Sequence, residues 1–458
     1  MRIIHTSDWH LGNAMFDIDR TEEIKSFFVW LRQQIVEREA DALVIAGDIF
    51  DNRIPSNEMK TLYYRFLASL LDTGCRNIFV AGGNHDSGAL LDATGELAEA
   101  LNIHVAGTIA DRSVEDLIYE ITDKSGECSA ICALIPFIRE ADLRRFYDGK
   151  WEERTFSDHA YGELYRQVLE AVDKKKAGRK LPVIVTGHLY AAALEGRYGD
   201  VEDDEKEMEA DDGVLSIDVR GNLGKVHADV FPGDFTYVAL GHIHYTSMVA
   251  GENRIRYSGS PFVMGFDETD IPRYVLQVDL EESTDGFSPV VEKLRVPGKD
   301  RFVRVCGSVD EIRERLLALK AEVQAADGNS VYAGNEVQAA DGNSVYVEIV
   351  YRQEDRALLE NVIDQAELPE RLQIVHWKKM KTARAANSFE DLRMEDVREI
   401  RLEDVVRCLV QEYYPPEVGI SEEEAETKVN ALVEEFLPYF REAENKVRVQ
   451  GGDGDEDN

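Results

Sequence analysis

The first 280 residues alternate between short apolar runs and longer segments in which apolar residues recur at helical spacing. The apolar runs predict strands over 2–8, 42–48, 77–84, 182–188 and 235–242. Helices are predicted between them, including 20–38 and 57–72. The second helix carries an apolar stripe, which indicates either core packing or a homodimer interface. This alternation of strands and helices predicts an α/β fold.

A second, smaller region follows Pro297 and Gly298, which mark a domain boundary in the pattern. Its runs follow the order strand, helix, strand, helix, strand, which predicts a small α+β domain. The pattern then becomes helical, with two amphipathic helices too small to form a core alone, so we expect them to dock on another surface. A short acidic tail ends the chain and is expected to be disordered. The expected divisions are 1–295, 296–382, 383–450 and 451–458.

The net charge of −37 changes the picture, because a chain this acidic should be repelled by DNA. Acidic residues are concentrated at 201–213, where eight acids accompany one lysine. The first residues, "MRIIHTSDWH", leave no room for a secretory leader, and no apolar run approaches the roughly 20 residues of a membrane span. Five scattered cysteines form no disulfide pattern. We therefore expect a soluble, cytoplasmic protein.

Each of the five predicted strands ends in polar side chains of types that bind metals. The candidates are Asp8, His10, Asp48, Asn84, His188, His242 and His244. Taken singly, such a motif is more often turn chemistry or a packed histidine than a ligand set. Ligands bind at the carboxyl ends of strands in α/β sheets, however, so loops that are distant in sequence can meet there. The joint pattern therefore predicts one shared metal site.

The types of ligand narrow the choice of metal. Carboxylates, imidazoles and an amide, without a thiolate, suit Mn²⁺, Fe or Zn²⁺ in a catalytic site. Seven candidates are too many for one ion, and they suit two ions that share a carboxylate, about 3.5–4 Å apart. Such a pair activates a water and neutralises phosphate oxygens, so the pattern predicts phosphoester hydrolysis.

Five short motifs carry a family resemblance. "DWH", "GDIFD", "GNHD", "GH" and "GHIH", in this order over residues 1–280, resemble the calcineurin-like metallophosphoesterases, which implies a two-sheet α/β core. A narrower resemblance is to the SbcD family, the nuclease subunits of bacterial SbcCD complexes. It is carried by "HTSDWHLG", "GDIFDNRIPS", "VAGGNHDS", "DFTYVALGHIH" and "RYSGSP". This resemblance also implies that 296–382 is a capping domain and that 383–450 docks an ATPase.

The resemblance implies a role for each candidate. It assigns one metal ion to Asp8, His10, Asp48 and His244. It assigns the second ion to Asp48, Asn84, His188 and His242, with Asp48 bridging. His85 would protonate the leaving 3′ oxygen or stabilise charge in the transition state. Asp51 is expected to contact the metal ligands without binding the metal itself. Asp86 either orients His85 or is an ordinary turn residue.

The implied activity is that of a metal-dependent DNA nuclease, a 3′-to-5′ double-strand exonuclease and a single-strand and hairpin endonuclease. It would use two divalent ions, Mn²⁺ foremost with Mg²⁺, Fe or Zn²⁺ as alternatives, and act with an SbcC-type ATPase in DNA end processing, repair and recombination. Two other interpretations stay open: a small-molecule phosphodiesterase, for which the helical tail has no use, and a scaffold with a decayed site, which the complete ligand set disfavours.

One departure from the family is the long, acidic segment after His188.

Overall fold

The computed structural model describes residues 1–146, 156–192, 226–269, 271–284, 286–328, 344–351 and 356–379. Apart from Lys379, these residues belong to one compact unit, Met1–Lys378. The helices expected over 383–450, the acidic segment 201–213 and the tail lie outside the described residues. Among the residues that are described, no helix is both long and apolar enough to cross a membrane.

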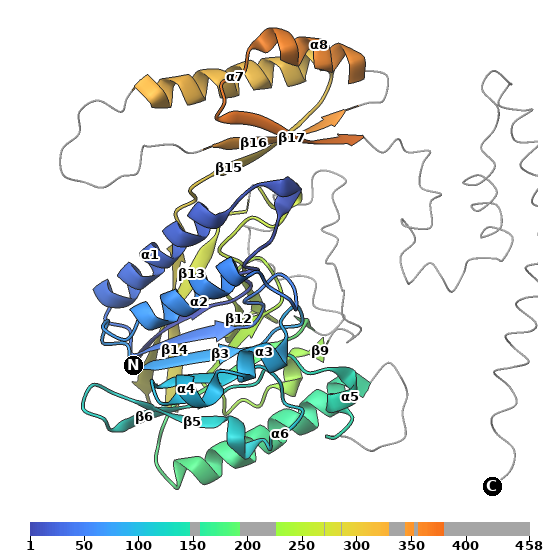
Figure 1. Ribbon diagram of the computed structural model, residues 1–458. Coiled ribbons are helices and arrows are strands. Elements are labelled where there is room, and N and C mark those ends of the chain that lie inside the picture. The colour runs from blue at the N-terminus through green and yellow to red at the C-terminus, as the bar shows by residue number, and fades with distance from the viewer. Residues whose placement is uncertain are drawn as a thin grey trace, which may run out of the picture. The chain divides into compact units, whose positions relative to one another are not determined.

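Two six-stranded sheets form the core (Figure 1). The first has the order β14-β13-β1-β2-β3-β4, with bounds Gly286–Arg295, Tyr274–Ser283, Arg2–Thr6, Ala42–Ala46, Asn77–Ala81 and Ile103–Ala106. The second has the order β11-β12-β10-β7-β6-β5, with bounds Ser247–Val249, Glu252–Tyr257, Tyr237–Gly241, Val183–His188, Cys128–Ala133 and Ile118–Thr122. The α/β prediction is confirmed, and the five expected strands divide between the sheets: β1, β2 and β3 in the first, β7 and β10 in the second.

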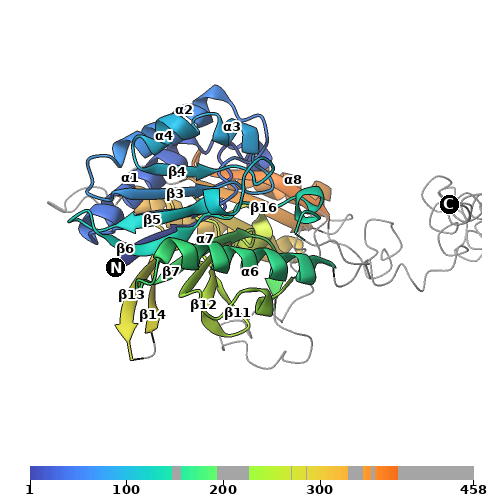
Figure 2. The same cartoon turned by 90° about the horizontal axis from the view of Figure 1, so that it is seen from below.

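The side chains of each strand alternate between two apolar clusters, and this alternation builds the layers. In β1, Ile3 belongs to the cluster that the two sheets share, whereas Ile4 belongs to the cluster beneath the helices α1 (Thr21–Glu37) and α2 (Asn57–Ser69). A third helix, α6 (Phe156–Lys176), packs beside the second sheet. Figures 1 and 2 show α1 and α2 on one side of the paired sheets and α6 on the other.

The stripe expected on the second helix is mostly part of this core. The buried residues of α2 are Met59, Tyr63, Phe66 and Leu67. Leu71, just beyond the helix, is 48% exposed. Core packing therefore explains most of the stripe, and a homodimer interface stays a prediction that would rest on the remaining exposed side chains.

A smaller β-α-β-α-β region follows, in the order expected. It consists of β15 (Arg301–Cys306), α7 (Val309–Gly328), β16 (Val345–Tyr351), α8 (Arg356–Ala366) and β17 (Leu372–Lys379). We call this region the cap. Both helices lie on one face of its sheet (Figure 1). From the cap, Phe302 and Tyr346 pack with Met15 and Phe266 of the two-sheet core.

Short elements complete the chain between these layers. They are α3 (Gly88–Asp92), α4 (Gly95–Glu99), α5 (Glu140–Leu143), β8 (Ala191–Ala192), β9 (Val226–His227) and the 3₁₀ turns η1 (Met15–Asp17), η2 (Glu115–Leu117), η4 (Ala228–Val230) and η5 (Phe266–Glu268). Two of them, η1 and η5, lie where the core meets the cap.

Candidate metal centre

The turn after β1 is fixed by a buried tryptophan. Trp9 is fully buried among three phenylalanine rings of α1 and α2, at centroid distances between 5.2 and 5.9 Å. Asp8 and His10 flank it with φ values of 53° and 43°. Their backbone N–H groups donate to the carbonyls of Gly47 (2.9 Å) and Asp48 (3.0 Å), which joins this turn to the end of β2. Positive φ in residues other than glycine is uncommon, and such strain gathers at functional sites.

Two glycines let the ends of the strands from both sheets approach closely. A Cβ atom on Gly47 would lie 2.3 Å from Nδ1 of His188, and one on Gly241 would lie 2.0 Å from the Ala46 carbonyl oxygen. Nδ1 of His188 donates to that same Ala46 oxygen at 2.9 Å. The bond fixes the ring of His188, which comes from the second sheet, against the first sheet and leaves Nε2 for the site.

The first neighbourhood of ligands joins the ends of β1 and β10. Ligand atoms of Asp8, His10 and His244 all lie within 4.8 Å of one another. The rings of His10 and His244 meet edge to face, with centroids 5.0 Å apart. Nε2 of His10 lies 3.5 Å from Oδ2 of Asp48, which belongs to the end of β2.

The second neighbourhood shares Asp48 with the first. Its Oδ2 lies 3.2 Å from Nε2 of His188. The Asn84 side-chain oxygen lies 3.0 Å from that same Nε2 and 3.1 Å from Nδ1 of His242. All seven residues expected to bind metal thus lie in two adjoining groups, with Asp48 between them.

These residues fit a divalent metal. Both ring nitrogens of His10 are buried, and neither has a hydrogen-bond partner among the described residues. The nearest carboxylate oxygen to its Nδ1, from Asp51, is 3.4 Å away. A buried polar group without a partner is costly, and coordination to a metal would satisfy one of these nitrogens. The carboxylates of Asp8 and Asp48 are also buried, and oxygen with imidazole nitrogen is a donor set for Mn²⁺, Fe or Zn²⁺.

Charges within the cluster shift the pKa values strongly. Burial alone would raise the pKa of Asp48, but the neighbouring imidazoles, above all His188, hold it below its usual range. Burial opposes protonation of His188, yet the Asp48 carboxylate raises its pKa to about 9. Burial and the charge of His188 lower the pKa of His242 to about 3. The Asp48 carboxylate therefore favours the protonated form of His188, and a divalent cation would compete with that proton.

Comparison with known proteins gives the same family over more than half of the chain. Residues 1–246 match the family model of the calcineurin-like phosphoesterases. The chain is 32% identical over 318 residues to the SbcD component of the SbcCD nuclease of Escherichia coli (strain K12), which covers 69% of this chain and 73% of that protein. The chain belongs to the SbcD family. The corresponding protein of Bacillus subtilis (strain 168) is 30% identical over 337 residues, 71% of this chain and 80% of its own length. That of Rhodobacter capsulatus is 32% identical over 290 residues, 61% of this chain and 66% of its own length.

His85 lies beside the seven candidate ligands of this SbcD-family chain, and its ring forms a further cluster with His10 and Asp51, with ligand atoms within 4.8 Å of one another. Its backbone N–H donates to Oδ1 of Asp48 at 2.9 Å. Its ring Nδ1 lies 2.8 Å from the Asp51 carbonyl oxygen. A carbonyl only accepts, so Nδ1 carries a hydrogen and Nε2 is the nitrogen that can exchange a proton. The ring also meets that of His10 at a centroid distance of 4.7 Å.

Asp51 and Asp86 support the site in different ways. Asp51 contacts two rings, that of His10 through its carboxylate and that of His85 through its carbonyl. The Asp86 carboxylate instead accepts hydrogen bonds from the backbone N–H groups of Ile49, Phe50 and Gly83, at 2.8 to 3.1 Å. Asp86 therefore joins the loops after β2 and β3, which corresponds to the turn interpretation rather than to orientation of the His85 ring.

Two supporting side chains could not be found from the sequence. Oε1 of Glu268, in η5, lies 3.3 Å from Nδ1 of His244. The Ser7 hydroxyl lies 2.5 Å from Oδ2 of Asp8 and 2.7 Å from the Ser258 hydroxyl, all three being buried. Glu268 belongs to none of the motifs, and Ser7, although it lies within "HTSDWHLG", is a residue whose contacts with Asp8 and Ser258 only the folded chain shows.

Proposed function

We propose that this chain cleaves DNA as a 3′-to-5′ exonuclease on duplex ends and as an endonuclease on single strands and hairpins, using two divalent ions, Mn²⁺ foremost. Membership of the SbcD family carries the general part: the chain is a metal-dependent nuclease of the SbcCD type. The proposal includes an SbcC-type ATPase partner, a homodimer and a place in the cytoplasm. The relatives named as SbcCD subunits support the partner and the nucleic-acid substrate.

One observation carries the proposal. Side chains from the ends of five strands, in two different sheets, meet around Asp48, whose Oδ2 lies 3.2 Å from one histidine and 3.5 Å from another. A carboxylate shared by two groups of donors is the arrangement that a pair of ions requires in phosphoester hydrolysis. The metal ligands we propose are Asp8, His10, Asp48 and His244 for one ion, and Asp48, Asn84, His188 and His242 for the other.

Bound there, the ions would lower the pKa of a water molecule and neutralise the oxygens of the scissile phosphate. The protein supplies the remaining steps. Nδ1 of His85 donates to the Asp51 carbonyl, which fixes the ring and its tautomer. In the imidazolium form Nε2 of His85 also carries a proton, which it gives to the 3′ oxygen as the P–O bond breaks, leaving the neutral ring with its hydrogen on Nδ1. The strained turns at Asp8 and Asp48 hold the ligands in place before substrate arrives.

The test separates proton transfer from metal binding. In His85→Ala we expect cleavage of a linear or hairpin DNA duplex to fall about 10²- to 10⁴-fold, the usual contribution of a general acid. The Mn²⁺ content, measured by calorimetric titration, should stay that of the wild type. If cleavage and metal binding were lost together, His85 would be a ligand and the assignment would be wrong.

A matched control is available in β4. His104 is also half-buried, and its ring packs against Phe79 at 5.2 Å and Tyr119 at 4.4 Å, away from the proposed ligands. His104→Ala removes an imidazole from the same sheet and should leave both cleavage and metal content unchanged.

A further inference from the structure

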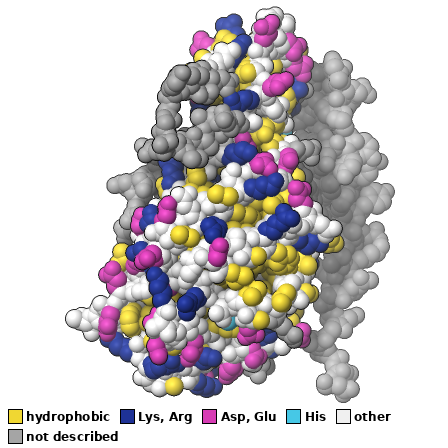
Figure 3. Space-filling model, turned by 60° about the vertical axis from the view of Figure 1, so that its left-hand side comes forward, with side chains coloured by type: hydrophobic (Ala, Val, Ile, Leu, Met, Phe, Trp, Pro, Cys, Tyr) yellow, Lys and Arg dark blue, Asp and Glu magenta, His cyan; other side chains and the backbone are white. Residues whose placement is uncertain are grey.

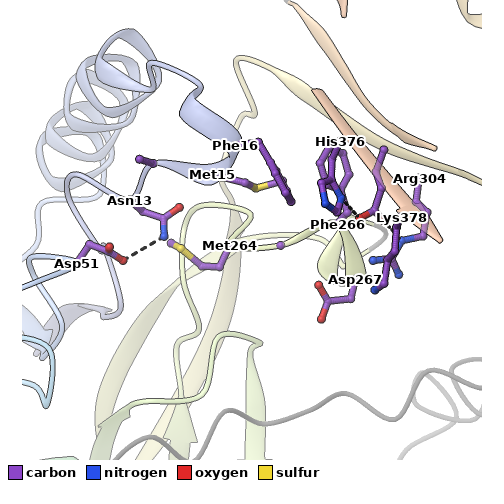
Figure 4. A pocket seen from close by; sticks show the side chains of 13 residues that line it. Asn13, Met15, Phe16, Asp51, Met264, Phe266, Asp267, Arg304, His376 and Lys378 are labelled. Carbon is purple, nitrogen blue, oxygen red and sulfur yellow. Dashed lines mark hydrogen bonds and ion pairs between the residues drawn. The ribbon is translucent and has the colours of Figure 1, made fainter. Parts of the chain in front are cut away.

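A cavity of about 520 Å³ opens between the loop after β1, the loop before η5 and the cap (Figure 4). Its volume falls within the range of pockets that hold small organic ligands. Asp51 lies in its wall and connects it with the metal centre. The Asp51 carboxylate is 3.4 Å from the ring of His10, and its carbonyl is 2.8 Å from that of His85. Whatever enters this cavity therefore lies next to the proposed site of cleavage.

Aromatic rings form one side of the cavity. Phe16, from the core, and His376, from the cap, stack with centroids 4.1 Å apart and planes at 28°. Phe266 adds a third ring, 5.5 Å from Phe16. Figure 4 shows these rings grouped on the side opposite Asp51. Phe16 is 40% exposed and has φ 52° and ψ 42°, a left-handed conformation that is unfavourable for a bulky side chain. The fold thus holds an apolar ring in contact with solvent at a conformational cost, which favours a ligand that stacks on it.

The charges of the cavity disfavour an anion inside it. The Glu348 carboxylate accepts from Nδ1 of His376 at 2.8 Å and also pairs with Arg304, and Lys378 adds a second cation to the cap wall. Asp51 and Asp267 add two further carboxylates to the lining. A phosphate within the cavity would lie near three acids and two bases, a lining of net negative charge, whereas an uncharged aromatic ring would meet no repulsion.

One polar atom is ready to recognise a ligand. Nδ2 of Asn13 donates to Oδ1 of Asp51 at 3.0 Å, which fixes the orientation of the amide. Its Oδ1 is buried and has no hydrogen-bond partner within the described part of the chain. Figure 4 shows this oxygen directed away from Asp51. A ligand N–H would satisfy this oxygen once the Asn13 side chain turned it toward the cavity, and nucleobases combine such a donor with an aromatic face.

We propose that this cavity receives one unpaired nucleobase of the strand that is being cut, stacked on Phe16 and recognised by Asn13. The inference rests on the proposed nuclease function and deepens it, because it makes an unpaired nucleotide beside the scissile phosphate part of the preferred substrate. Stacking tolerates any base, so the cavity would select unpaired structure rather than sequence.

The test removes the base and the ring in turn. An abasic nucleotide is placed at each position flanking the cleavage site of a hairpin substrate, and kcat/KM is measured with the full-length protein and Mn²⁺. At one position we expect the wild type to lose about 5- to 150-fold, the range for stacking of one base. In Phe16→Leu the intact substrate should be cleaved more slowly by a similar factor, and the abasic penalty should fall to near one. His376→Gln, which removes the partner ring, should act in the same direction.

A second measurement does not depend on metal. A single-stranded oligonucleotide with one 2-aminopurine, mixed with the wild type in EDTA, should lose fluorescence as the base stacks, and Phe16→Leu should reduce this quenching. Phe287→Leu is the control: this half-buried aromatic residue of β14 lies outside the cavity lining and should change neither result. Thermal unfolding followed by circular dichroism should be the same in all variants and shows that they are folded.

The outcomes separate the two proposals. An abasic penalty in Phe16→Leu equal to that of the wild type, with unchanged quenching, would overturn the base site while cleavage itself persists. If the wild type cleaved no DNA, the nuclease proposal would fail, and the quenching in EDTA would still decide whether a base binds at Phe16. If Phe16→Leu impaired only the capture of an ATPase partner, the cavity would be a protein-binding site and the inference would be wrong.

Discussion

The His244 ring contacts the carboxylate of Glu268, and this carboxylate in turn accepts a hydrogen bond from Arg273. Oε1 of Glu268 lies 3.3 Å from Nδ1 of His244, and Oε2 accepts from Nη2 of Arg273 at 2.8 Å. Nη1 of Arg273 also donates to the His244 carbonyl at 2.9 Å. Burial alone would raise the pKa of Glu268, but the bond to His244 and the charge of Arg273 lower it to about 2. Glu268 is therefore ionised at neutral pH and holds the ring through Nδ1, which leaves Nε2 for the metal that we propose.

Glu268→Gln should weaken Mn²⁺ binding about 10- to 100-fold, the usual effect of losing a partner that supports a ligand. Only one of the two binding steps in a calorimetric titration should change, because His244 serves one of the two proposed ions. Asp267→Asn removes the same charge one position earlier and should leave both steps intact. Equal weakening in the two variants would mean that general charge, rather than orientation of His244, sets the affinity.

The sequence predicts the roles of some site residues but not of others. The seven proposed ligands could be found because each follows an apolar run, and strand ends are the places where loops converge. Glu268 could not, because it is an ordinary acid in a 3₁₀ turn and reaches His244 only through tertiary packing. The sequence allows two roles for Asp86, and the folded chain shows three backbone N–H groups donating to its carboxylate, as in an ordinary turn.

At the scale of elements, the alternation of strands and helices was predictable and the family resemblance implied two sheets, but the sheet to which each strand belongs was not predictable. Apolar runs mark β2 and β7 equally well. Which strand pairs with which is set by contacts between residues far apart in the chain, such as the pairing of Ala42 with Asn77 or of Ile184 with Tyr237. The residues alone predict convergence at a single sheet edge. In the fold, two sheets meet face to face, and glycines at their strand ends set how closely the ligands approach.

Gly47 allows that approach, so we expect Gly47→Ala to damage the metal centre although glycine binds no metal. Its φ of +95° is unfavourable for alanine, and the new Cβ would lie 2.3 Å from Nδ1 of His188. The free energy of unfolding should fall, and His188 should be pushed away from Asp48, which would weaken one of the two Mn²⁺ binding steps.

Gly74→Ala is the matched control for Gly47→Ala. Gly74 has a similar φ of +85°, but its Cβ would meet nothing within 4 Å. Both variants should lose about 1 kcal/mol or more to the backbone conformation, measured by urea unfolding. Only Gly47→Ala should also lose metal. Equal metal binding by the two variants would show that the contact between the strand ends does not position His188.

At the scale of the whole molecule, the net charge of −37 must be reconciled with a nucleic-acid substrate. The face in Figure 3 shows Lys and Arg side chains interspersed with Asp and Glu, rather than a continuous basic stripe. Duplex DNA is bound mainly through neutralisation of its phosphates, so this charge distribution favours weak binding by the chain alone. A partner that holds the DNA would resolve the conflict, and docking that partner is the role we expect for the two amphipathic helices over 383–450.

Deletion of residues 395–458 tests that role. Each predicted helix has one apolar face, and two such helices cannot bury both faces without another surface. The truncated chain keeps every proposed ligand, so we expect it to hydrolyse bis(p-nitrophenyl) phosphate with Mn²⁺ at the rate of the full chain. It should fail to retain an SbcC-type ATPase in a co-purification, and cleavage of duplex DNA with that ATPase and ATP should be lost.

Deletion of the acidic tail 451–458 alone is the control and should preserve capture of the ATPase. This comparison distinguishes the loss of the docking helices from the loss of negative charge. Capture of the ATPase by the longer truncation would place the docking surface within the two-sheet core or the cap.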